Sequence, residues 1–180
     1  MTDRKTFIEQ TLDECKRRLY RIVRDLSSAE LVWRPTPEAN SIGFMLWHVA
    51  RVEDRWLHCF AQDTTEVWTR DHWAQRCGLP AEDTGVGYTA AQLATFAVPA
   101  VETLQGYFDA VRQATVTYLQ GLDDNALDVH PGRIPFPEIS PRPLPDDFTI
   151  ARMFRQLIGE ENQHLGQIAY VRGLQRGLDQ

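Results

Sequence analysis

Residues 149–174 read TIARMFRQLIGEENQHLGQIAYVRGL, and apolar side chains recur in this stretch at steps of three and four. At 3.6 residues per turn, this spacing lines them along one side of an α-helix. The stripe consists of Ile150, Phe154, Leu157, Leu165 and Ile168. Thr149 is a good N-terminal cap and Gly177 a good C-terminal stop. The stretch therefore predicts a helix from residue 150 to about residue 174.

Three further segments upstream show the same helical periodicity. The first covers residues 7–26, and the second begins after the capping residue Ser41 and runs through residues 42–60. The third, residues 89–119, opens with a Thr-x-x-Gln capping box, and Pro99 is expected to kink it. Together with the last helix, these segments predict four long helices.

Two long connections separate these helices. Residues 62–88 are expected to contain one short helix at about Trp68–Arg76. Residues 123–148 hold six of the ten prolines of the chain, which excludes regular structure and predicts an irregular crossover or a lid. No repeat and no alternating strand pattern is present. The sequence therefore predicts an all-α fold, a four-helix bundle with long crossover connections, in a single domain over residues 1–180.

Composition and charge exclude several classes of protein. With 43% hydrophobic and 24% charged residues, the chain has enough apolar surface for one core, which excludes intrinsic disorder. Its net charge is −6 without a basic block, so a nucleic-acid partner is not expected. No apolar run approaches the roughly 18 residues of a membrane span. Three widely spaced cysteines without a C-x-x-C motif suit a reducing compartment, so we expect a cytoplasmic protein.

Polar side chains interrupt the apolar stripes of two helices. On the last helix, His164 and Glu161 lie within the stripe, and Glu160 lies at its edge, four positions before His164. On the second helix, His48 flanks the stripe and Glu53 falls within it. A buried carboxylate is costly unless it is paired or coordinated. One His from the second helix with a Glu and a His from the last would form a metal site with an open position. Hydrogen-bonded core groups or a buried ion pair are the alternatives.

Two segments resemble signatures of the DinB-like superfamily. Residues 40–53, NSIGFMLWHVARVE, resemble its second-helix signature, and residues 160–173, EENQHLGQIAYVRG, resemble its fourth-helix signature, often H-x-x-x-H-x-G-Q. The upstream Trp33-Arg34-Pro35 also fits. The resemblance implies a bundle with up-down-down-up topology that is frequently homodimeric. It also implies a divalent metal, usually zinc or nickel, held by three residues of the second and fourth helices.

Carried over by position, the metal ligands implied by the resemblance are His48, Glu160 and His164. Glu160 stands where many members have a histidine, but the mycothiol-dependent maleylpyruvate isomerases of the same superfamily also use a His-Glu-His set. Because Glu161 is adjacent, either Glu160 or Glu161 is the carboxylate ligand. Glu53 either orients a metal-bound histidine or acts as a base, or else it forms a buried ion pair with an arginine.

The resemblance implies a divalent-metal-dependent enzyme that acts on a small molecule. Two reactions are considered, an S-transfer that uses a low-molecular-weight thiol and a hydrolysis. A metal in the site would lower the pKa of the bound thiol in the first case and of bound water in the second. The alternative is a non-catalytic dimeric metal- or ligand-binding protein linked to the stress response.

Five other residues have simpler interpretations. Gly166 is expected to permit close helix packing. Cys59 is expected to be a buried apolar thiol. The remaining histidines have no partners at ligand spacing and are expected on the surface or in loops: His58, His72 and His130.

Overall fold

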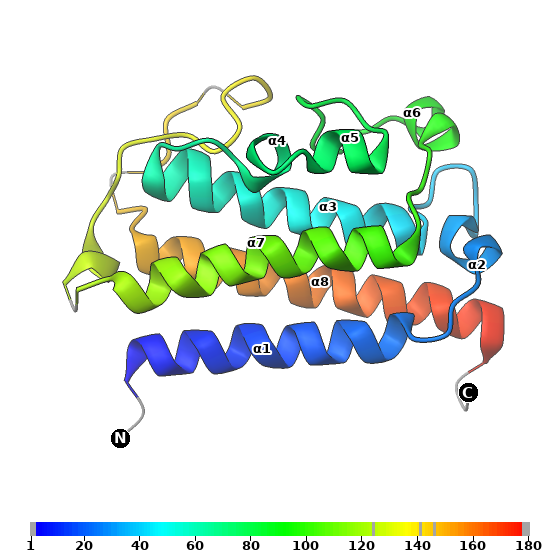
Figure 1. Ribbon diagram of the computed structural model, residues 1–180, viewed down its shortest axis with the longest axis horizontal. Helices are drawn as coiled ribbons and strands as arrows, with labels where there is room; N and C mark the ends of the chain where they lie inside the picture. Colours follow the sequence, from blue (N-terminus) through cyan, green and yellow to red (C-terminus); the bar gives the residue numbers. More distant parts are fainter. Residues whose placement is uncertain (1–2, 124, 141, 146, 178–180) are drawn as a thin grey trace.

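Four long helices dominate the computed structural model, which describes residues 3–123, 125–140, 142–145 and 147–177 (Figure 1). These helices are α1 (Arg4–Val23), α3 (Ile42–Arg55), α7 (Val101–Gly121) and α8 (Ile150–Arg176). Figure 1 shows α1 and α8 running in one direction and α3 and α7 in the other. The predicted all-α bundle with up-down-down-up topology is therefore confirmed. No strand occurs in the described part of the chain.

The predicted capping residues start the helices. The Ser41 hydroxyl accepts a hydrogen bond from the backbone N–H of Phe44 at the start of α3. The Thr149 hydroxyl does the same for the N–H of Arg152 at the start of α8. Each cap satisfies an N–H group that has no partner within the helix. These local bonds fix where the two helices that carry the predicted ligands begin.

The segment predicted as one kinked helix over residues 89–119 is two helices, so that prediction is wrong. The capping box at Thr89 opens α6 (Ala90–Thr95), which ends in extended backbone at Phe96 before α7 begins. Pro99 accounts for the break, because proline lacks an N–H and disfavours helical backbone at the preceding residue. The chain therefore leaves the helical conformation instead of bending within it.

The connections contain short helices that periodicity did not predict. Ser27 and Glu30 form a capping box that starts α2 (Ser28–Val32). The helix expected at Trp68–Arg76 is replaced by α4 (Val67–Arg70) and α5 (Trp73–Cys77). His72, between them, has a φ of 59°, which interrupts a right-handed helix. Beyond α3, the chain continues as the π-helical segment η1 (Trp56–Gln62).

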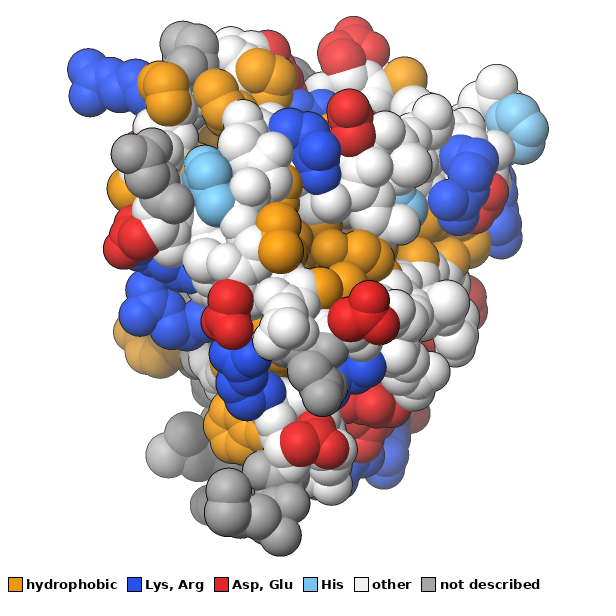
Figure 2. All heavy atoms as spheres, turned by 90° about the vertical axis from the view of Figure 1, so that its left-hand side faces the viewer, with side chains coloured by type: hydrophobic (Ala, Val, Ile, Leu, Met, Phe, Trp, Pro, Cys, Tyr) orange, Lys and Arg blue, Asp and Glu red, His pale blue; other side chains and the backbone are white. Residues whose placement is uncertain are grey.

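The crossover between α7 and α8 is irregular, as predicted, apart from the short 3₁₀ helix η2 (Ala126–Asp128). It contributes Leu127 and Phe148 to the hydrophobic core. Figure 2 faces this end of the bundle, where hydrophobic side chains gather in a central hollow between acidic and basic groups. The proline-rich segment thus covers part of the core.

Helix α3 lies inside the molecule. It packs against α7 and α8, the α4 segment lies against it, and every residue from Ile42 to Asp54 is buried. Among these residues are polar side chains, and each of them needs a partner in the interior. Among the described residues, no helix is both long and apolar enough to cross a membrane.

Candidate metal centre

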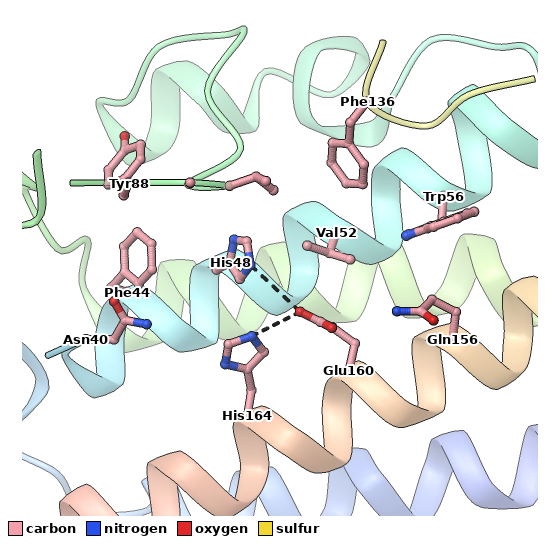
Figure 3. Close-up of a pocket in the computed structure, with 13 residues that line it drawn as sticks. Asn40, Phe44, His48, Val52, Trp56, Tyr88, Phe136, Gln156, Glu160 and His164 are labelled. Carbon is pink, nitrogen blue, oxygen red and sulfur yellow. Dashed lines mark hydrogen bonds and ion pairs between the residues drawn. The ribbon is translucent and has the colours of Figure 1, made fainter. Parts of the chain in front are cut away.

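The three predicted ligand residues meet between α3 and α8 (Figure 3). Oε1 of Glu160 lies 3.1 Å from Nε2 of His164 and 4.0 Å from Nε2 of His48. One ligand atom from each residue lies within 4.8 Å of the other two, so the cluster could hold a metal ion. The fold thus brings together side chains that are more than a hundred residues apart in the sequence.

The donor set fits a divalent ion. Two ligand atoms of a tetrahedral zinc ion lie about 3.4 Å apart when each bond is about 2.0–2.1 Å long. The two distances from Glu160, 3.1 and 4.0 Å, lie on either side of this value. Two imidazole nitrogens and one carboxylate oxygen suit zinc and nickel. Three protein ligands also leave a position for a small molecule.

The orientation of His48 is fixed by the loop that covers it. Nδ1 of His48 donates a hydrogen bond to the carbonyl oxygen of Thr84 over 2.8 Å. A carbonyl can only accept, so the proton is on Nδ1 and the lone pair of the neutral ring is on Nε2, toward Glu160. Burial lowers the pKa of His48, which favours this neutral form. Phe44 stacks on the ring at 5.7 Å.

Glu160 is the carboxylate of this cluster. Its hydrogen bond with His164 lowers the pKa of the Glu160 carboxyl. The carboxylate is therefore ionised at neutral pH. Metal binding requires this form, since a protonated carboxyl is a poor ligand.

Glu161 and Glu53 are paired with a buried arginine instead. Arg112 of α7 donates from Nε to Oε1 of Glu53 over 2.9 Å and from a terminal nitrogen to Oε2 over 2.8 Å. The same terminal nitrogen contacts the Glu161 carboxylate. Of the three roles considered for Glu53, the structure shows the buried ion pair. Of the two adjacent glutamates, it places Glu160 beside the histidines and Glu161 in the core.

A second buried polar network lies on the other side of α3 and was not predicted. Asp54 accepts hydrogen bonds from the N–H groups of Val67 and Trp68 and from the Tyr107 hydroxyl. Arg51 lies beside it, 3.3 Å from the Asp54 carboxylate. The pair thereby anchors the short helix α4 to α3.

Two minor predictions are wrong. His58 is buried, not on the surface: its Nδ1 pairs with the Thr64 hydroxyl, and its Nε2 lies 3.5 Å from Asp54. Burial lowers its pKa to about 4. Gly166 does not mediate helix packing, because a Cβ at that position would meet nothing within 4 Å. The His58 partners are close in sequence, and the pair with Asp54, four positions earlier, was overlooked. For Gly166, no neighbouring helix among the residues that the structure describes comes near enough for a side chain to matter.

The loop over His48, residues 83–88, is held by Arg51, which also belongs to the buried network around Asp54. Arg51 donates from Nε to the carbonyl oxygen of Asp83 over 2.9 Å, one residue before the carbonyl that orients His48. The Asp83 carboxylate accepts hydrogen bonds from the Gly85 N–H and the Tyr88 hydroxyl. No motif or helical periodicity in the sequence indicates this role of the loop.

A pocket of about 410 Å³ opens over the cluster. This volume is within the range of small-molecule sites. Figure 3 shows aromatic side chains on both sides of the three clustered residues. The pocket is lined by Asn40, Phe44, His48, Val52, Trp56, Gly85, Val86, Gly87, Tyr88, Phe136, Gln156, Glu160 and His164. Phe136 comes from the proline-rich crossover, so that segment forms part of the wall.

Replacing Gly85 with alanine is expected to weaken metal binding about 10–100-fold, as the loss of a partner of a metal-ligating histidine does. A Cβ on Gly85 would lie 2.7 Å from Trp47, 2.9 Å from Phe44 and 3.1 Å from Nδ1 of His48. The loop must therefore move away, and the Thr84 carbonyl leaves the imidazole. Competition titration against a chromogenic chelator measures the affinity.

Gly87→Ala is the matched control. Gly87 has a φ of 73°, close to the 72° of Gly85, but a Cβ on it would meet nothing within 4 Å. Gly87→Ala introduces the same backbone strain as Gly85→Ala without the collision. The metal affinity of this variant is therefore expected to equal that of the wild type. Equal weakening in both variants would contradict the role given to the Thr84 carbonyl.

The three cysteines are free, and the metal cluster of the described residues includes none of them. Cys59 is half-buried, and burial raises the pKa of its thiol to about 11 from an ordinary value of 9.0. Because only the thiolate reacts, alkylation by iodoacetamide at pH 8 is expected to be about 100-fold slower in the folded chain than in the unfolded chain.

The rate at Cys59 is expected to rise about tenfold per pH unit between pH 8 and 10, because the thiolate fraction does so below the pKa. Peptide mass spectrometry at each pH measures it. A folded-state rate equal to that of the unfolded chain would show that the thiol is not shielded.

Comparisons with known proteins agree with this fold. A sequence model of the DinB superfamily matches residues 11–168. The chain is also similar to a crystal structure of a conserved protein from Enterococcus faecalis, with a TM-score of 0.80 and 22% identity, over 97% of this chain and 98% of that one. At this identity the likeness concerns the fold alone. A search of curated proteins finds no match.

Proposed function

Because the chain belongs to the DinB superfamily, we propose that it is a divalent-metal-dependent enzyme whose ion, zinc or nickel, is held by His48, Glu160 and His164. The supporting observation is the convergence of two imidazoles and one carboxylate on a pocket of about 410 Å³. A structural metal is normally enclosed by four protein ligands, whereas this set has three and faces a pocket.

The residues that line the pocket favour thiol transfer over hydrolysis. A divalent ion bound there would lower the pKa of a thiol or a water in its open position. Hydrolysis also calls for a base to take the proton of the water. Glu160 is the single carboxylate among the described lining residues, while Glu53 and Glu161 are engaged by Arg112. Thiol transfer needs no such base, because a thiol that is acidic enough loses its proton to solvent.

In the proposed reaction, the sulfur of a low-molecular-weight thiol bonds to an electrophilic carbon of a second small molecule. The leaving group of that carbon departs with the electron pair of the broken bond. Nε2 of His48, directed by the Thr84 carbonyl, and the imidazole of His164 would supply two nitrogen ligands. Glu160 supplies one negative charge, so a divalent ion in the site would keep a net charge of +1 to attract a thiolate.

Removal of the metal tests this proposal. Thiol consumption is followed with benzyl mercaptan and 1-chloro-2,4-dinitrobenzene, whose chloride is displaced by the sulfur. After chelation, turnover is expected to fall to the uncatalysed rate and to return when zinc or nickel is added. Helicity is expected to be retained, because the four helices pack through two hydrophobic clusters formed by other residues. The melting temperature is expected to fall only by the stabilisation that metal binding itself supplies.

Two other results would contradict the proposal. Loss of helicity together with the metal would indicate a structural site. Turnover that survives chelation would show that the reaction does not use the metal.

A further inference from the structure

The pocket over the three ligands has an unusual charge composition. Among its described lining residues there is no lysine or arginine, and Glu160 is the only acid. The nearest arginines on α3 are engaged elsewhere. Arg51 lies between Asp54 and Glu66, and Arg55 donates to the Pro135 carbonyl and to Glu138. The pocket therefore offers an anionic group of a ligand no counter-charge beyond the metal itself.

The walls of the pocket are aromatic and held in place. Phe44 and Tyr88 lie at one end of the pocket, with their ring centroids 5.4 Å apart (Figure 3). Trp56 and Phe136 lie at the other end, with their ring centroids 6.5 Å apart. Trp56 is stacked on Phe148 with an interplanar angle of 15°, which fixes the plane of the indole. Such preformed apolar walls favour a ligand with an apolar or aromatic body.

The remaining polar groups of the pocket are neutral. Gln156 lies one turn before Glu160 on α8, and Asn40 lies near Phe44 at the other end (Figure 3). Amides of this kind can donate to and accept from uncharged polar groups, but they do not compensate the lost hydration of a carboxylate.

We infer that the site selects an uncharged organic thiol with an aromatic or alkyl body over a thiol that carries carboxylates. Gln156 is then a specificity-determining residue, because it occupies the position from which a cation could meet a carboxylate of the ligand. The inference rests on the proposed function, since it places the sulfur at the metal. It adds the chemical class of the thiol, which metal binding alone does not define.

A matched pair of probes tests the selection. Benzyl mercaptan and 4-(mercaptomethyl)benzoate differ only in a carboxylate. Both can be titrated into the zinc-loaded chain while tryptophan fluorescence is followed, since Trp56, one of the five tryptophans, lines the pocket. Benzyl mercaptan is expected to bind at least about tenfold more tightly, because the carboxylate of the other probe loses part of its hydration between the aromatic walls without a basic partner.

Gln156→Lys is expected to abolish this preference, because the added positive charge meets the carboxylate and raises the affinity of the carboxylate probe at least about tenfold relative to that of benzyl mercaptan. Gln156 is exposed, so the substitution does not disturb the core. Gln163→Lys adds the same charge at an exposed position of the same helix that does not line the pocket, and it is expected to change neither affinity.

Zinc analysis of each sample separates the possible failures. If the chain holds zinc but binds both probes equally well, or neither, the inference on specificity is wrong and the metal site stands. It is also wrong if Gln156→Lys and Gln163→Lys have the same effect. If the chain holds no zinc, the proposed function fails, and the inference fails with it.

Discussion

Replacing Arg112 with leucine is expected to lower the free energy of unfolding by about 3–5 kcal/mol. Its guanidinium joins the four long helices, because it binds Glu53 of α3, Glu161 of α8 and the carbonyl of Leu12 of α1 from its own place on α7. Without it, two carboxylates stay buried without a counter-charge. In a chain of this length, the melting temperature should fall by about 6–20 °C. Thermal and urea denaturation followed by circular dichroism measure the change.

The triple variant, in which Arg112, Glu53 and Glu161 are all leucine, is the control. It removes the two buried charges together with their partner, and such replacements are often neutral or stabilising. It is therefore expected to recover most of the stability that the single variant loses. A triple variant as unstable as the single one would show that packing of the Arg112 side chain, and not its charge, supplies the stability.

Replacing Glu160 with glutamine is expected to weaken metal binding by more than about 100-fold. Loss of a residue that only hydrogen-bonds to a metal ligand costs roughly 10–100-fold, and loss of a ligand itself is expected to cost more. The amide removes the charge and the ionised oxygen, the atom that lies near both histidine Nε2 atoms. Glu161→Gln makes the same chemical change at the next residue, whose carboxylate contacts Arg112 instead. It is expected to leave the metal affinity unchanged.

Competition titration of the two variants beside the wild type measures these affinities. The comparison also corrects for any general effect of removing one negative charge from α8. A larger loss in Glu161→Gln than in Glu160→Gln would contradict the assignment of the carboxylate and would make Glu161 the ligand.

The parts of the fold and the site that could be predicted are those determined within one helix. Ser41 and Thr149 begin their helices through hydrogen bonds three residues ahead. Glu160 and His164 share a face because they are four positions apart. The apolar stripes indicated that this face and that of His48 point inward. These local features predicted the bundle and placed a histidine of one helix opposite a glutamate and a histidine of another. The specific set of His48, Glu160 and His164 came from the resemblance to the DinB-like superfamily.

The rest depends on contacts between distant segments. The choice between Glu160 and Glu161 follows from Arg112, which lies on another helix, and both positions are compatible with the stripe. The Thr84 carbonyl reaches His48 only because the connection after α3 folds back over this helix, where Arg51 holds it. No periodicity or cap marks such a return in the sequence.

The metal content of the purified chain tests whether His48, Glu160 and His164 hold an ion. The chain is purified without a metal-affinity tag and analysed by plasma mass spectrometry beside His48→Ala and His164→Ala. The account predicts about one zinc, nickel or similar ion per chain in the wild type and none in either variant, with the helical circular dichroism spectrum retained in all three. A wild-type chain that holds no metal, even after incubation with zinc and nickel, would contradict it.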